Sequence, residues 1–300
     1  MPYKNIAVIG AGTIGSPIAK VSSNFTSQPL GKALITIYIQ ALLAEGANVI
    51  VVARAESTSA KDLPSAIKVV SAPLTDVSAL AAVFKEHKVE VVVSTVAHDA
   101  LPNQHLLGDA AKEAGVKLFV PSEFGYSTLG LTEGELGLKA KFGEHLEQIG
   151  LPFTRIFTGG FITFIPWLLN VSSGKVEILG KGDQKATFTH PDDISGFIAY
   201  VVTHLSPSQL ENKFFRIQGE RASLLDIAGY YKLPVEHVMA FEGPDGGFKT
   251  FLHELVNSGK GSVGYSELAG RELTGADAAG ASNALWEGHH WTGIKEGLGL

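Results

Sequence analysis

Short apolar runs alternate with amphipathic segments along the first half of the chain. The runs are rich in β-branched side chains and occupy residues 5–9, 47–53, 67–71, 89–96 and 116–120. Runs of this kind are typical of parallel strands that are buried on both faces. The segments between them carry apolar residues at helical spacing, which predicts crossover helices. We therefore expect an α/β fold built on a doubly wound parallel sheet.

Several of the predicted elements have recognisable ends. Asp76 is a typical N-cap for a helix that runs to His87. Gly115 and Gly150 are placed as the C′ residues of two later helices. A sixth strand is expected at residues 152–157.

The alternation of strand and helix patterns ends after residue 158, where glycine, proline and aromatic residues become frequent. Hairpin-like segments are expected at 176–179 and 186–189. A helix should then begin at Asp192 or Asp193, and the remainder from Ser223 is mainly helical.

These changes predict two domains. The first is a nucleotide-binding domain over residues 1–158, and the second is a smaller substrate-binding lobe over 159–300. Within the lobe, residues 191–218 are expected to pack back on the sheet. The lobe should cover the carboxyl ends of the strands, where open parallel sheets bind ligands.

Residues 21–40 do not fit this pattern. The flanking residues 13–20 and 41–46, joined directly, would give one helix of the expected length with a glycine at its end. Val21-Ser22 and Ile39-Gln40 can be encoded by splice donor and acceptor sequences. One hypothesis is therefore a retained intron translated in frame, and the alternative is a genuine loop insertion.

The first strand runs into a glycine motif. Gly10, Gly12 and Gly15 form G-x-G-x-x-G with Thr13 and Ile14 between them. At a strand-to-helix junction, such glycines permit a tight turn, a close approach of a pyrophosphate and close helix packing. The helix N-terminus offers N–H groups to the phosphates. We therefore expect a Rossmann-like domain that binds a dinucleotide through these residues.

The residue at the end of the second strand indicates which cofactor is preferred. NAD-preferring sites usually carry an acidic residue there, whereas this chain has Arg54. A guanidinium can pair with the 2′-phosphate of NADP(H), and Lys61 could assist. The alternative is that both are solvated surface charges. Glu56 argues in the other direction, since a carboxylate there would favour NAD.

Composition limits the remaining possibilities. The net charge is −6 at pH 7, so no nucleic-acid partner is expected. The chain has no cysteine, which excludes disulfides and thiolate chemistry and suits a reducing compartment. No apolar stretch reaches the roughly 18 residues of a membrane span. We expect no membrane association and a cytoplasmic location.

Several motifs together resemble those of a known family. They are the glycine motif, Arg54, Ser94-Thr95-Val96, Pro121-Ser122-Glu123-Phe124-Gly125, Lys139-Ala140-Lys141-Phe142 and Pro191-Asp192-Asp193-Ile194. In these motifs the chain is similar to the isoflavone reductase-like, or NmrA-like, branch of the atypical short-chain dehydrogenases. The resemblance implies NADPH-dependent reduction of small, often aromatic, molecules by hydride transfer.

Five residues follow strand ends and should border the nicotinamide. They are Thr95, Val96, Pro121, Ser122 and Phe124. Phe124 could instead be a core residue. For Ser122 and Glu123, the alternative is that they cap the following loop and have no contact with the cofactor.

The resemblance implies that Lys139 assists proton transfer and holds the nicotinamide ribose. Lys141, two positions later on another helix face, is the alternative. The Tyr-x-x-x-Lys pair of common short-chain dehydrogenases is missing, because Glu135 stands four positions before Lys139.

The resemblance also assigns Phe161, Phe164 and Trp167 to the substrate pocket, with packing between the two lobes as the alternative. His190 could reach the pocket or could be structural. His289 and His290 are adjacent and point apart, and no third ligand has suitable spacing, so we expect no metal site.

Two functions remain open from the sequence. The first is an NADPH-dependent reductase of a small hydrophobic or aromatic substrate. The second is a non-catalytic NADP(H) sensor that regulates a partner protein, because fold alone does not decide. A monomer or a homodimer is expected.

Overall fold

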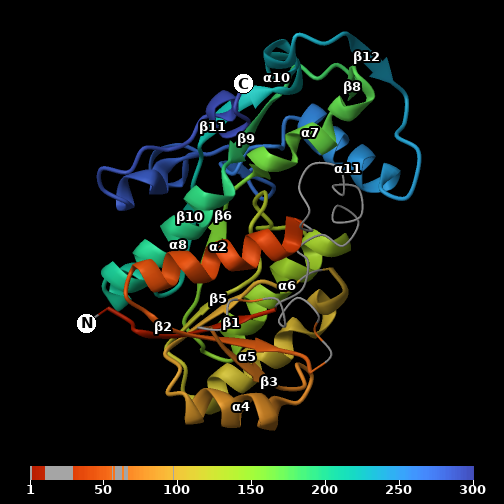
Figure 1. The fold of residues 1–300 in the computed structure, drawn as a ribbon. Helices are drawn as coiled ribbons and strands as arrows, with labels where there is room; N and C mark the ends of the chain where they lie inside the picture. The colour runs from red at the N-terminus through yellow and green to blue at the C-terminus, as the bar shows by residue number, and fades with distance from the viewer. Residues whose placement is uncertain (1, 11–29, 56, 58–62, 64–66, 97) are drawn as a thin grey trace.

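The computed structural model describes residues 2–10, 30–55, 57, 63, 67–96 and 98–300, with the backbone alone for 30–35 and 98–99. Its centre is a five-stranded parallel sheet in the order β3-β2-β1-β4-β5 (Figure 1). The strands are β1 (Asn5–Ile9), β2 (Asn48–Ala53), β3 (Lys68–Ser71), β4 (Val91–Ser94) and β5 (Leu118–Val120). The predicted α/β fold with a parallel doubly wound sheet is confirmed.

The parallel arrangement continues beyond β5. A parallel bridge joins Phe119 to Phe153, immediately before β6 (Thr154–Phe157). Strand β6 pairs in parallel with β10 (Lys213–Arg216). Residues 213–216 of the second half therefore lie beside the first-half strands, while the boundary between the two predicted domains stays a prediction.

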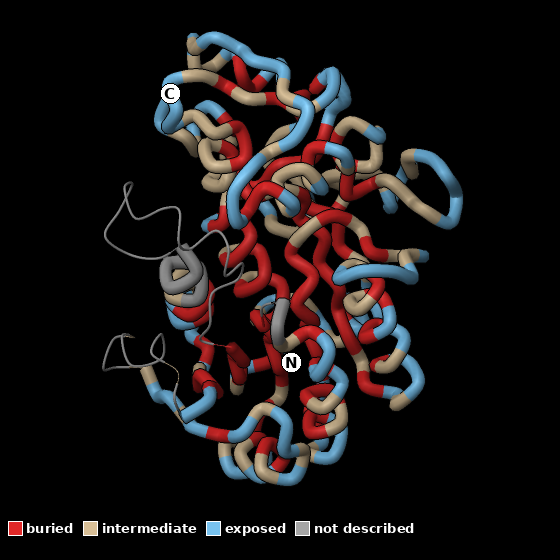
Figure 2. Tube along the Cα trace, turned by 90° about the vertical axis from the view of Figure 1, so that its right-hand side faces the viewer, coloured by how far each residue is buried: buried red, intermediate tan, exposed pale blue. Residues whose placement is uncertain are grey.

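Helices cover both faces of the sheet (Figure 1). One face carries α2 (Leu30–Ala44) and α8 (Pro191–His204), and the other carries α4 (Val77–Glu86), α5 (Gln104–Ala114) and α6 (Gly134–Gln148). Ile6 and Val8 pack toward the first group, whereas Ala7 and Ile9 pack toward the second. This two-sided burial explains why β1, β2, β4 and β5 are apolar without alternation and mostly buried (Figure 2), whereas β3 at the edge of the sheet is largely exposed.

The predicted helix ends are also found. The Asp76 side chain accepts a hydrogen bond from the Ala79 N–H at 3.0 Å, as an N-cap should. Gly115 has φ +75° and Gly150 has φ +62°, values in the left-handed region that glycine adopts without strain. One boundary was wrong, because α8 begins at Pro191 and His190 is its N-cap. Proline is favoured at the first helical position, where its missing N–H is not needed.

The C-terminal part has a separate apolar core, which includes Ile162, Ile178, Phe188 and Ile227. The helices here are α7 (Ile165–Leu168), α9 (Pro207–Leu210), α10 (Leu224–Tyr231), α11 (Gly246–Asn257) and α12 (Ile294–Gly297). The strands are β7 (Gly160–Phe161), β8 (Val176–Leu179), β9 (Lys185–Thr189), β11 (Glu220–Ser223), β12 (Val235–Val238), β13 (Tyr265–Ser266) and β14 (Arg271–Glu272).

The hairpin expected from β8 and β9 is wrong. Strand β8 pairs in parallel with β12, and β9 pairs with β7 and β11. The Asn257 side chain explains this, since it donates to the Leu179 carbonyl at 2.6 Å and accepts from the Gly182 N–H at 2.9 Å. The backbone groups that a hairpin turn would have paired are therefore bound to α11.

Helix α2 falls partly on the unusual segment 21–40. Its residues 30–40 continue into 41–44 as one helix, and Tyr38 and Ile39 are buried against the sheet. Tyr38 is only 2% exposed, so this helix does not leave that aromatic side chain in solvent. Residues 21–29 lie outside the described residues, and the retained intron stays a prediction.

Deleting residues 21–40 tests that hypothesis. The deletion places Ile18 and Ala19 at the positions of Tyr38 and Ile39, so an apolar face is kept. We expect higher soluble yield and a higher Tm, because the glycine motif then leads directly into the crossover helix. Differential scanning fluorimetry measures the Tm. Losing a required Ile39 would cost about 2–5 kcal/mol, so a lower Tm would show that the segment is a genuine structural element.

Candidate functional site

The ends of β1 and β4 approach each other closely. Gly10 follows β1 with φ +101°, and a Cβ there would lie 3.1 Å from the carbonyl carbon and oxygen of Thr95. The buried Thr95 hydroxyl lies 3.0 Å and 2.9 Å from the carbonyl oxygens of Ile9 and Gly10. Any larger residue at position 10 would fill this space. The rest of the motif, namely Gly12, Thr13, Ile14 and Gly15, lies outside the described residues.

The ends of β4 and β5 are joined by Ser122. Its hydroxyl donates to the Val96 carbonyl at 2.9 Å, and its backbone N–H donates to Gln104 Oε1 at 3.1 Å. Val96, Pro121 and Ser122 are all buried, and they lie at the carboxyl ends of β4 and β5. Their direct contact with a nicotinamide stays a prediction.

Arg54 directly follows β2 and is exposed. This position at the carboxyl end of the sheet suits the predicted contact with a 2′-phosphate, which stays a prediction. Lys61 and Glu56 lie outside the described residues.

Glu123 belongs to a buried polar network. Arg155 donates from Nε to Glu123 Oε1 at 2.7 Å, and the Thr128 hydroxyl donates to Glu123 Oε2 at 3.0 Å. Arg155 also donates from Nη2 to the Thr128 hydroxyl oxygen at 2.5 Å. We did not predict this network from the sequence, although a charged residue within the apolar strand β6 is an available signal.

The residue after Glu123 in the chain lines a cavity, so the buried polar network lies next to that cavity. Phe124 has φ +33°, an uncommon value for a residue with a side chain. Its ring packs 5.4 Å from that of Tyr38 and also lines the cavity. The Lys139 ammonium donates to the Glu123 carbonyl oxygen at 2.6 Å. Phe124 and Lys139 are thus brought together by one short segment.

The cavity has a volume of about 730 Å³ and is lined by residues of α6, α7 and α11. Phe161, Phe164 and Trp167, which the sequence assigned to a substrate pocket, all line it, as does Lys139. Lys141 lies on the exposed side of α6. The geometry therefore favours Lys139 over Lys141 as the residue that meets a bound molecule.

The protonation of Lys139 is set by opposing effects. Burial lowers its pKa, the nearby carboxylates of Glu123 and Glu135 raise it, and the Arg155 guanidinium lowers it. The resulting pKa is below the ordinary lysine value. A lysine in this condition gives up its proton more easily than a solvated one.

The outer wall of the cavity comes from the C-terminal part, which sequence reasoning did not assign. Phe248, Phe251 and Leu255 of α11 line it, together with an ion pair in which Lys260 Nζ lies 2.9 Å from Glu267 Oε1. The amphipathic pattern of α11 was the available signal. It could not show that part of this face borders a cavity instead of a core.

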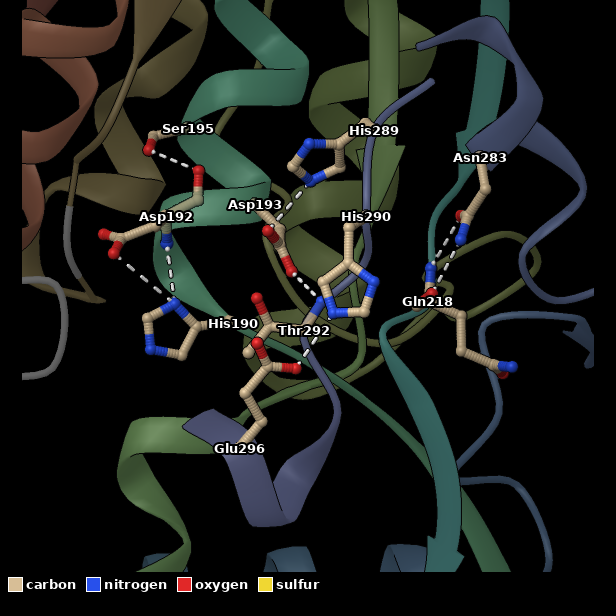
Figure 3. Close-up of polar contacts among 10 residues, drawn as sticks. All are labelled: His190, Asp192, Asp193, Ser195, Gln218, Asn283, His289, His290, Thr292 and Glu296. Atoms are coloured by element: carbon tan, nitrogen blue, oxygen red, sulfur yellow. Dashed lines mark hydrogen bonds and ion pairs between the residues drawn. The ribbon is translucent and has the colours of Figure 1, made fainter. Parts of the chain in front are cut away.

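The histidines singled out from the sequence lie near the start of α8 (Figure 3). His190 accepts from the Asp192 N–H as the helix N-cap, which is a structural role. His289 lies 2.9 Å from Asp193, and His290 lies 3.0 Å from Glu296. Within the described part of the chain, no group of three histidine, cysteine or acidic residues is arranged to hold a metal ion. A membrane-spanning helix is likewise not found among the described residues.

Comparisons with known proteins agree with this architecture. The chain is 30% identical over 210 residues to phenylcoumaran benzylic ether reductase IRL1 of Ginkgo biloba, covering 66% of this chain and 64% of that protein. It is 33% identical over 141 residues to phenylcoumaran benzylic ether reductase 1 of Arabidopsis thaliana, covering 43% of this chain and 45% of that protein. The aligned part is thus about half the length of that relative.

The fold is shared with a solved reductase. The leucoanthocyanidin reductase–NADPH binary complex from Vitis vinifera superposes with a TM-score of 0.74 at 21% identity, covering 98% of each chain. The model of the NmrA-like family matches residues 2–242. Because that match covers most of the chain, this protein belongs to the NmrA-like family.

Proposed function

We propose that this protein is an NADPH-dependent reductase that transfers hydride to a small hydrophobic or aromatic substrate. The observation that carries the proposal is the cavity, which joins Phe124 and Lys139, beside the strand ends, to the aromatic side chains Phe161, Phe164 and Trp167. Reductases of phenylcoumaran benzylic ethers and leucoanthocyanidin are among the similar proteins. No observation here favours the alternative of a non-catalytic sensor.

The residues present fit a dinucleotide. Because Gly10 has no side chain, the ends of β1 and β4 lie close together at the carboxyl end of the sheet, where a dinucleotide would bind. The buried Ser94 hydroxyl at the end of β4 has no hydrogen-bond partner among the described residues. Arg54 stands at the end of β2, where a 2′-phosphate would be bound. The solved relative from Vitis vinifera contains NADPH, which supports the same cofactor here.

The cofactor, when bound, supplies the hydride. The protein's part is to hold an aromatic substrate against Phe161, Phe164 and Trp167 and to exclude water with the apolar wall. The Lys139 ammonium then donates a proton to the oxygen of the substrate that gains electron density. The Glu123 carbonyl fixes the position of the ammonium before the substrate arrives.

The pH dependence of turnover follows from this role. Lys139 must be protonated to donate, and burial holds its pKa below the ordinary lysine value. Turnover should therefore persist at low pH and fall as pH rises through this lowered pKa. The check is kcat measured from neutral to alkaline pH, with NADPH saturating. An activity that rises with pH would mean that Lys139 acts as a base.

A substrate screen tests the proposal directly. NADPH oxidation is followed by absorbance with a panel of aromatic ketones, aromatic enones and benzylic ethers, and products are identified by mass spectrometry. We expect turnover with at least one class and little with aliphatic analogues of the same size. NADPH binding without oxidation across the whole panel would contradict the proposal and favour a sensor.

A further inference from the structure

The backbone carbonyl and the side-chain carboxylate of Glu123 bind two different cationic residues. Its backbone carbonyl accepts from the Lys139 ammonium at 2.6 Å, whereas its carboxylate accepts from Arg155 at 2.7 Å and from Thr128 at 3.0 Å. The charged partner of a half-buried lysine would ordinarily be a carboxylate. Here the carboxylate is occupied by another cation.

Arg155 is held tightly in this position. It is 3% exposed, and its guanidinium lies 5.6 Å from the ring centre of Phe157 and 5.8 Å from that of Phe214. A Cβ on Gly143 of α6 would lie 2.5 Å from Arg155 Nη1, so the helix approaches the guanidinium at a glycine. A side chain this confined has one available geometry.

Stability alone gives a weak reason for such an arrangement. Taking a carboxylate and a guanidinium out of water costs about as much as their attraction returns, so apolar residues would often serve as well. The pair lies directly behind the residue that meets the substrate, which is where its charge would matter.

We propose that Arg155 is a positioning residue for the reaction: by binding the Glu123 carboxylate, it keeps that carboxylate away from Lys139 and leaves the ammonium facing the cavity. The proposal rests on the proposed function, in which Lys139 is the proton donor. Without Arg155, the carboxylate would pair with the ammonium and compete with the substrate oxygen.

Charges around Lys139 set the sign of the expected effects. Glu123 and Arg155 lie behind it, and Glu135 lies on its own helix. Glu133 is at the exposed rim of the cavity, and across the cavity Lys260 and Glu267 are paired with each other. Removing the Arg155 charge should therefore raise the pKa of Lys139, and removing the Glu123 charge should lower it.

The experiment uses Arg155→Met, Arg155→Lys and Glu123→Gln in the full chain. The pKa of Lys139 is measured without turnover, from the pH dependence of its labelling by acetic anhydride, read by peptide mass spectrometry. We expect Arg155→Met to raise this pKa, Glu123→Gln to lower it and Arg155→Lys to remain near the parent protein. In turnover assays, Arg155→Met should lower kcat by roughly 10- to 100-fold with little change in KM for NADPH.

Arg216→Met is the matched control. Arg216 is also 3% exposed, its Nη1 lies 2.7 Å from Asp277 Oδ1, and its guanidinium lies 5.9 Å from the ring centre of Phe157. It does not act on Lys139, since Glu123, Glu135 and Arg155 are the charges that shift the pKa of that lysine. A comparable loss of Tm with an unchanged pKa of Lys139 is expected.

Three results would overturn the proposal. One is a pKa of Lys139 that does not move in Arg155→Met, and another is a shift of the same sign in Glu123→Gln. The third is a shifted pKa with unchanged kcat. If the parent protein fails to oxidise NADPH with every substrate of the panel, the proposed function is refuted, whatever the labelling result.

Discussion

Replacing Lys139 by alanine is expected to lower kcat by about 10²–10⁴-fold, the usual range for general acid catalysis. NADPH affinity should change little, because the ammonium is bound to the Glu123 carbonyl and faces the cavity. Steady-state kinetics with the best substrate of the screen, together with fluorescence titration of NADPH, separate the two effects.

Lys141→Ala is the control for that substitution. Lys141 lies on the same helix but on its exposed side, so its loss should leave kcat almost unchanged. If Lys141→Ala were inactive and Lys139→Ala active, the assignment of the proton donor would be wrong.

Replacing Arg54 by alanine is expected to weaken NADPH binding by about 1.5–3 kcal/mol, the value of a charge-assisted hydrogen bond. This corresponds to roughly 10- to 150-fold in Kd. NADH lacks the 2′-phosphate, so its Kd should barely change. Isothermal titration calorimetry with both cofactors provides the comparison.

Arg271→Ala provides a control for general electrostatic effects. Arg271 is an exposed arginine on β14, in the C-terminal part of the chain. The Arg271→Ala substitution should leave the Kd values for NADPH and NADH unchanged. Equal weakening of NADPH and NADH by Arg54→Ala would refute a role at the 2′-phosphate.

The sheet was predictable because its signal is local and strong. Strands buried on both faces are almost wholly apolar, as β1 is from Ile6 to Ile9 and β4 is from Val91 to Val93. Asp76 and Gly115 were predictable for a similar reason, since caps depend on the chemistry of single residues. The preference for Lys139 over Lys141 came from the resemblance, and helical geometry explains why only one of them lines the cavity.

What the sequence did not reveal depends on contacts between distant residues. Arg155 and Glu123 are 32 positions apart, and nothing in the local sequence around either residue pairs them. The separation of β8 from β9 depends on Asn257, which arrives from α11 much later in the chain. The apolar face of α11 has the pattern of any core helix, and only the fold shows that part of it borders a cavity.

Transfer of deuterium from cofactor to product tests the central claim most directly. NADPH deuterated at C4 of the nicotinamide, on either face, is incubated with the protein and its best aromatic substrate, and the product is analysed by mass spectrometry. The account predicts one deuterium on the reduced carbon with one of the two labelled faces, and almost none with Lys139→Ala. A product without deuterium from either face, or no product at all, would contradict a reductase that works by hydride transfer in this cavity.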